Sequence, residues 1–112
     1  MEMKVERLED DVTRIVLVGR LDIQGAQQID LQFSAVTNGP KRIVVDVEQV
    51  SFLASMGIRT LILGAKAVSS KGGRMVLLKP NTDVEKVLVG SGTDTVIPIF
   101  RDISSALAAM SA

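Results

Sequence analysis

Hydrophobic residues follow two different spacings along the chain, and the change from one spacing to the other predicts its secondary structure. Short runs of Val, Ile and Leu, or their alternation with polar residues, are typical of β-strands. One such run precedes the polar turn at residues 9–11. Others fall at residues 13–18, 42–47, 74–79 and 96–100. Apolar residues three or four apart indicate amphipathic helices at residues 23–36, 57–71, 81–90 and 102–110.

The predicted elements follow the order β-β-α-β-α-β-α-β-α. Strands that alternate with helices are joined by right-handed crossovers, which produce a mainly parallel sheet. The strand at residues 13–18 is mostly apolar, so we expect it to be covered on both faces and to end at Gly19. Pro98 places the last strand at a sheet edge. The sequence predicts one compact α/β domain over residues 1–112, built on a mixed, mainly parallel sheet.

The predicted helix at residues 57–71 is apolar on two sides. One stripe faces the expected core and consists of Ile58, Leu61, Ile62, Ala65 and Val68. The second stripe consists of Met56, Thr60, Leu63 and Ala67. A helix with two apolar sides is either deeply buried or presents one side to a partner. In so short a chain we expect the second stripe to bind another protein, and the flexible thioether of Met56 suits such a contact.

Composition narrows the chemistry available to the chain. It has no Cys and no His, which excludes disulfides, thiol chemistry and the usual zinc sites, and removes the commonest general base. Thirteen basic residues balance thirteen acidic ones, so net charge gives no reason to expect nucleic acid or an anionic membrane as partner. The charged first residues do not resemble a signal peptide or a membrane anchor. We expect a cytoplasmic protein without metal or cofactor.

Ser55 stands where a predicted strand gives way to a helix, in the stretch SFLASMG. Its hydroxyl could cap the helix, attack a substrate or receive a phosphate. A nucleophilic serine needs an adjacent base, and neither a His, nor a Ser-x-x-Lys pair, nor a G-x-S-x-G motif supplies one here, so no catalytic residue is expected. A cap and a phosphate would both use the free amides of the first helical turn, and both interpretations stay open.

Two carboxylates are further candidates for a site. Asp22 and Asp46 each fall at the end of a predicted strand, so we expect them at the same edge of the sheet, where α/β proteins usually bind ligands and partners. Each is also placed to cap the segment that follows it. Capping and partner contact are compatible roles.

Three segments together resemble the STAS domain of bacterial anti-sigma-factor antagonists. They are GRLDIQGAQQI, IVVDVEQVSFLASMG and TVIPIFRDISSALAAM. The family pattern runs from a strand through an Asp and an apolar pair to Asp-Ser-Ser/Thr-Gly at the start of a helix. The residues that fall on this pattern in register are Asp46, Val50, Phe52, Leu53, Ser55 and Gly57.

The resemblance implies a protein switch. In such systems an anti-sigma kinase binds either a sigma factor or the antagonist, and the unphosphorylated antagonist captures the kinase and frees sigma for transcription. The kinase phosphorylates the serine that corresponds to Ser55, the complex weakens, and a phosphatase resets it. Nucleotide and magnesium would belong to the kinase. On this chain the expected partner-binding residues are Asp22, Asp46, Ala54, Met56, Gly57, Thr60 and Leu63.

The sequence departs from the family pattern on both sides of the serine. The usual acidic residue before it is Ala54, and the usual hydroxyl residue after it is Met56. These changes remove a group that could orient the kinase and make the surface more apolar, which favours a permanent complex. Two alternatives without a switch therefore stay open, a stressosome component and the small subunit of a lipid-transport ABC complex.

Overall fold

The computed structural model describes the backbone of residues 1–111 and the side chains of residues 1–110. The strands are β1 (Glu2–Arg7), β2 (Thr13–Leu21), β3 (Arg42–Leu53), β4 (Arg74–Leu78) and β5 (Ile99–Phe100). The helices are α1 (Ile23–Thr37), α2 (Ser55–Ser69), α3 (Thr82–Gly90) and α4 (Ile103–Ser111), with short 3₁₀ turns at Glu9–Asp11 and Thr93–Thr95. This order confirms the predicted alternation of strands and helices.

The strands form one five-stranded sheet in the order β1-β2-β3-β4-β5. β1 is antiparallel to β2, and every other neighbouring pair is parallel. The sheet is therefore mixed and mainly parallel, as predicted. β5 has only two residues and directly follows Pro98, which fits an edge strand because proline cannot donate a ladder hydrogen bond.

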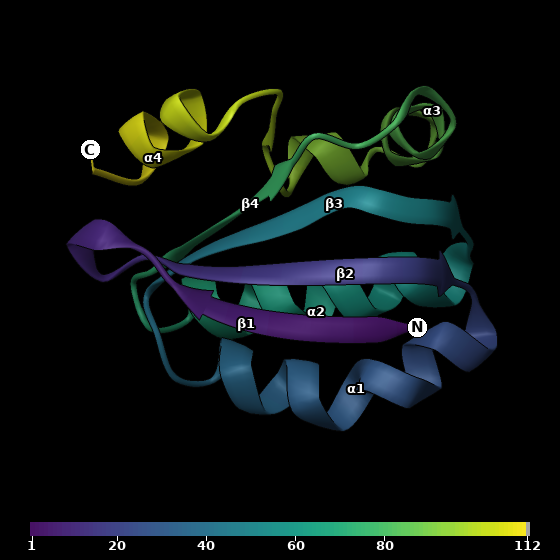
Figure 1. Ribbon diagram of the computed structural model, residues 1–112, viewed down its shortest axis with the longest axis horizontal. Coiled ribbons are helices and arrows are strands. Elements are labelled where there is room, and N and C mark those ends of the chain that lie inside the picture. Colours follow the sequence, from purple (N-terminus) through teal and green to yellow (C-terminus); the bar gives the residue numbers. More distant parts are fainter. Residues whose placement is uncertain (112) are drawn as a thin grey trace.

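Helices pack on both faces of the sheet, and the alternation of side chains in the central strands explains how. Ile43 and Val45 of β3 belong to the larger core cluster, together with apolar residues of α1, α2 and α3. Val44, between them, joins a smaller cluster with Ala106 and Met110 of α4. Figure 1 shows α1 and α2 on one side of the molecule and α4 on the other. A strand buried on both faces reads as a continuous apolar run.

β2 differs from the prediction in length and in cover. It continues to Leu21, because Gly19 adopts a φ of +117° at a shift in the pairing register and bends the strand without ending it. Its second face is covered only in part, because Val16 is buried there, whereas Arg14 and Val18 are partly exposed. α4 packs on β4 and β5, and the partly exposed Arg14 lies on the open part of this face. The expectation that residues 13–18 are covered on both faces therefore holds only in part.

β3 is twice as long as the predicted strand at residues 42–47. Residues 43–46 pair with both β2 and β4, whereas Gln49, Val50, Phe52 and Leu53 pair with β2 alone. This extension carries the chain past the end of β4 and places the start of α2 beside the end of β2. Among the described residues, no helix is long and apolar enough to cross a bilayer.

Candidate functional site at the start of α2

Ser55 is the first residue of α2 and its side chain is exposed. The N-cap position belongs to Ala54, whose extended backbone (φ −119°, ψ 175°) leads from β3 into the helix. The interpretation of Ser55 as the N-cap was therefore wrong by one position. The helix begins two residues earlier than its apolar spacing indicated, because Ser55 and Met56 are helical without contributing to the buried stripe.

Backbone packing against the end of β2 holds the start of α2 in place. The amide of Ala54 donates to the carbonyl oxygen of Leu21 at 3.1 Å. Gly57 is buried against the same residue, where an added Cβ would lie 2.4 Å from that oxygen. Only glycine allows this approach. Gly57 therefore positions Ser55 from beneath the surface.

The first turn of α2 has no side-chain cap, and in this it differs from the other described helices. Asp22 accepts from the amide of Gly25 in α1, Asn81 from that of Val84 in α3, and Asp102 from that of Ser105 in α4, each at 2.8 Å. The first turn of α2 also carries no acidic residue. The partial positive charge of this helix end is thus not neutralised by a carboxylate of its own.

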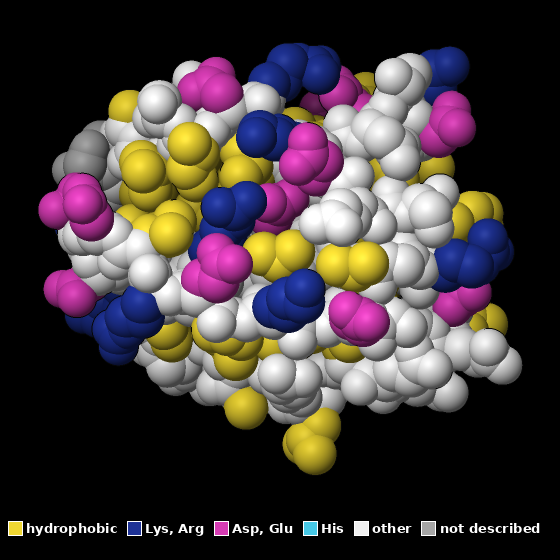
Figure 2. Space-filling view, in the orientation of Figure 1, with side chains coloured by type: hydrophobic (Ala, Val, Ile, Leu, Met, Phe, Trp, Pro, Cys, Tyr) yellow, Lys and Arg dark blue, Asp and Glu magenta, His cyan; other side chains and the backbone are white. Residues whose placement is uncertain are grey.

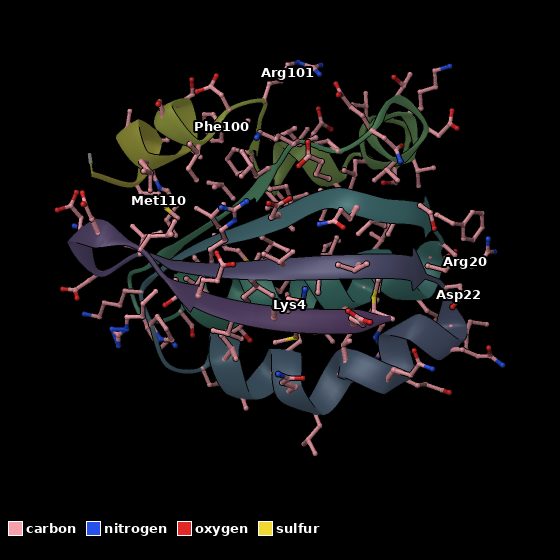
Figure 3. The ribbon with its side chains drawn as sticks, viewed as in Figure 1. Lys4, Arg20, Asp22, Phe100, Arg101 and Met110 are labelled. Carbon is pink, nitrogen blue, oxygen red and sulfur yellow. The ribbon has the colours of Figure 1, made fainter. Side chains whose placement is uncertain are left out.

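Asp22 caps α1, which confirms the capping role predicted for it. The hydrogen bond from Gly25, more than the ion pair with Arg20 at 3.4 Å, lowers the pKa of its carboxyl group. Arg20 also stacks over the ring of Phe52, with its guanidinium carbon 4.3 Å from the ring centre. Figure 3 shows Arg20 and Asp22 together at one end of the sheet. The sequence did not suggest the Arg20–Phe52 contact, because it depends on the register of β2 against β3.

Asp46 does not lie at the edge of the sheet, and its predicted capping role was wrong. It sits within β3, 3% exposed, and its carboxylate pairs with Arg14 of β2 and accepts from the amide of Glu48 at 3.0 Å. The hydrogen bond to Asp46 raises the pKa of Arg14. The carboxylate is engaged in this internal pair, and its side chain is only 4% exposed.

A groove of about 390 Å³ runs between α1 and α2, beside Ser55. The second apolar stripe of α2 lines it, with Met56 36% exposed and Leu63 54% exposed. Thr60 is buried in the groove and donates to Asp30 of α1 at 2.8 Å. The groove is narrow at Gly64, where an added Cβ would lie 2.5 Å from the ring of Phe33. The stripe is therefore neither fully buried nor freely exposed.

The predicted site residues thus fall into three groups. Asp22, Ala54 and Ser55 lie where the end of β2 meets the start of α2. Met56, Thr60 and Leu63 lie further along α2 and line the groove. Asp46 lies apart, inside the sheet. Within residues 1–110, no group of three or more Asp, Glu, His or Cys side chains could hold a metal ion.

Known proteins share this architecture. BtrV of Bordetella bronchiseptica, a candidate anti-sigma factor antagonist, is 26% identical over 110 residues, which are 97% of this chain and 94% of that protein. The structure of an anti-sigma-factor antagonist (STAS) domain protein from Planctomyces limnophilus matches with a TM-score of 0.85 at 29% identity, over 96% of each chain. A Thermotoga maritima structure matches with a TM-score of 0.89 at 24% identity, over 98% of this chain and 95% of that one. The family model of the STAS domain matches residues 3–106, and the chain belongs to the STAS domain family.

Proposed function

We propose that this protein is an anti-sigma factor antagonist that binds an anti-sigma kinase through the start of α2 and is released when Ser55 is phosphorylated. The observation that carries the proposal is an exposed hydroxyl at the first position of α2, the only described α-helix without a side-chain cap. The names of the relatives in Bordetella and Planctomyces support the antagonist role.

The phosphate fits this helix start for electrostatic reasons. The kinase would transfer the γ-phosphoryl group of ATP to the oxygen of Ser55, with ADP leaving and the hydroxyl proton passing to a base on the kinase. The new group carries about −1.5 to −2 charges at neutral pH. The uncapped amides of α2 can donate hydrogen bonds to the phosphate without loss of an existing capping bond, so the fold tolerates the modification.

The same phosphate would disturb a partner seated on the neighbouring apolar surface. Met56 follows Ser55 directly, and Leu63 lies two turns further along the groove. A kinase packed against these side chains would have to remove water from a doubly charged group as well. Binding and phosphorylation are therefore mutually unfavourable, which is the requirement for a switch.

Two variants of Ser55 test the switch. With the cognate kinase and ATP, the protein should gain one phosphate by mass spectrometry, and Ser55→Ala should abolish it. Ser55→Asp should weaken the unphosphorylated complex by more than about 1 kcal/mol, roughly fivefold in Kd, measured by calorimetry. Ser104→Ala and Ser104→Asp are matched controls, because Ser104 is exposed in the first turn of α4 on the other side of the sheet. A kinase that binds but leaves Ser55 unmodified contradicts the switch, and an unchanged Kd for Ser55→Asp contradicts its place in the interface.

A second function is favoured by one feature of the same site. Ala54 and the exposed Met56 flank the serine with apolar surface, which suits a permanent subunit of a stressosome or a transporter ATPase complex. Such a subunit would co-purify with its partner at fixed stoichiometry. In that case Met56→Asp would break the complex, whereas Ser55→Ala would change nothing in the presence of ATP.

A further inference from the structure

The outer side of β1 is a long strand edge without a partner strand in the described part of the chain. β1 and β5 are the two edge strands of the sheet. β5 has two residues, whereas β1 has six, and five of these are exposed. An edge strand leaves alternate N–H and C=O groups unpaired on its outer side. Another antiparallel strand can extend the sheet there.

Charges of alternating sign follow β1 on the sheet face that α1 and α2 do not cover. Glu2, Lys4 and Glu6 lie on this face, in register with Val18, Val16 and Arg14 of β2. Figure 2 shows the acidic and basic side chains alternating over β1, and Lys4 is marked in Figure 3. On the other face of the strand, Val5 is 46% exposed.

We propose that two copies of this chain associate by antiparallel pairing of their β1 strands about a two-fold axis at Val5. In this register Lys4 of each copy lies opposite Glu6 of the other, so two pairs of opposite charges form across the junction. Val5 meets its own copy, and exposed apolar surface is removed from water. The occupant of the edge is a second copy because the strand is complementary to itself.

Other registers of the two β1 strands are less favourable than the one with its axis at Val5. An axis at Lys4 places Glu2 opposite Glu6 and Lys4 opposite Lys4, and like charges that face each other oppose pairing. An axis at Met3 brings Glu2 opposite Lys4, but it pairs only residues 1–5. It also draws in Met1, whose ammonium group is held 2.7 Å from Oε1 of Gln28. The axis at Val5 uses residues 3–7 of the regular strand. One strand pair is a small interface, so the dimer should be weak and concentration-dependent.

Single-cysteine variants test the register, because the natural chain has no cysteine. Residues that face each other across an antiparallel pair have Cα atoms about 4.5–5.5 Å apart, within the span of a disulfide. Oxidised Val5→Cys should form a disulfide-linked dimer rapidly. Met3→Cys, on the same face of the strand but opposite Arg7, should do so much more slowly. Equal rates, or a faster Met3→Cys, overturn the proposed axis.

Charge exchange tests the contact without a cross-link. In sedimentation equilibrium, Lys4→Glu and Glu6→Lys should each weaken dimerisation about tenfold, and the double variant should restore it. Glu2→Lys is the matched control and should leave association unchanged. Melting curves must show that each variant is folded, since a carboxylate oxygen of Glu6 also lies 4.0 Å from Arg14. A monomer at every soluble concentration, or single variants that associate like the natural chain, overturns the proposal.

Discussion

The starts of α1 and α2 use the same packing but differ in how their amides are satisfied. Both begin beside the end of β2, and both bring a glycine of the first turn against a backbone carbonyl there. An added Cβ would lie 2.0 Å from the oxygen of Arg20 at Gly25, and 2.4 Å from that of Leu21 at Gly57. Asp22 caps α1, whereas Ala54 offers α2 no acceptor.

This comparison shows that the position of a helix start and the availability of its amides are set by different contacts. Close backbone packing fixes where the helix begins, and capping decides whether its amides remain available for another anion. In α1, a carboxylate of the same chain, that of Asp22, accepts a hydrogen bond from a first-turn amide. α2 is anchored equally firmly by Gly57 and the Ala54–Leu21 hydrogen bond, yet its amides remain open beside Ser55. A phosphate can therefore enter at α2 without dislodging the helix.

The largest effect should come from filling the space at either glycine. Gly25→Ala and Gly57→Ala should each lower the free energy of unfolding by about 2–3 kcal/mol, because the new methyl group meets backbone that cannot move aside. Urea denaturation measures this loss. Gly90→Ala is the control, since nothing lies within 4 Å of an added Cβ at that helix position. If Gly57→Ala were as stable as Gly90→Ala, the start of α2 would not be held by this contact.

A smaller effect should come from giving α2 the cap that it lacks. Ala54→Asp should raise the free energy of unfolding by about 1 kcal/mol, because its carboxylate can accept from the open first-turn amides. Ala54→Val, which adds bulk without an acceptor, is the comparison. No gain in stability from Ala54→Asp would mean that these amides are already satisfied.

The smallest effect concerns pH. The amide of Gly25 holds the pKa of Asp22 below its usual value, so its ionised form stabilises the fold above the pKa of the unfolded chain. That contribution is lost as the pH falls through the lowered pKa, below about pH 4. Asp22→Asn should remove this part of the acid dependence. Asp102 contributes a similar term, because the amide and hydroxyl of Ser105 lower its pKa, so the variant must be compared with the natural chain. NMR titration of the Asp22 carboxyl carbon measures the pKa directly, and an ordinary value would contradict the cap.

The two carboxylates that sequence reasoning treated alike show where such reasoning fails. Asp22 follows a strand, precedes a helix and caps it, as its local neighbours predict. Asp46 was expected to do the same after residue 47, but the strand continues to Leu53. What extends β3 is its pairing with β2, and this contact lies outside any local window of sequence. Arg14, the partner of Asp46, lies 32 residues away in the chain.

The apolar stripes of α2 give a similar lesson. Their spacing predicted a helix with two apolar sides, and this is observed. Whether the second side is buried depends on α1, which packs beside it and covers Thr60 while leaving Leu63 exposed. Spacing within one helix carries no information about the neighbour that faces it.

The sequence alone determined the order of strands and helices, the absence of cysteine and histidine chemistry, and the serine at the start of a helix. These follow from local spacing, turn residues and composition, which act over a few neighbouring positions. Only the tertiary structure decided the length of β3, the burial of Asp46, the groove beside α2 and the open edge of β1. Each of these depends on which distant segments pair, and that is settled by the free energy of packing the whole chain.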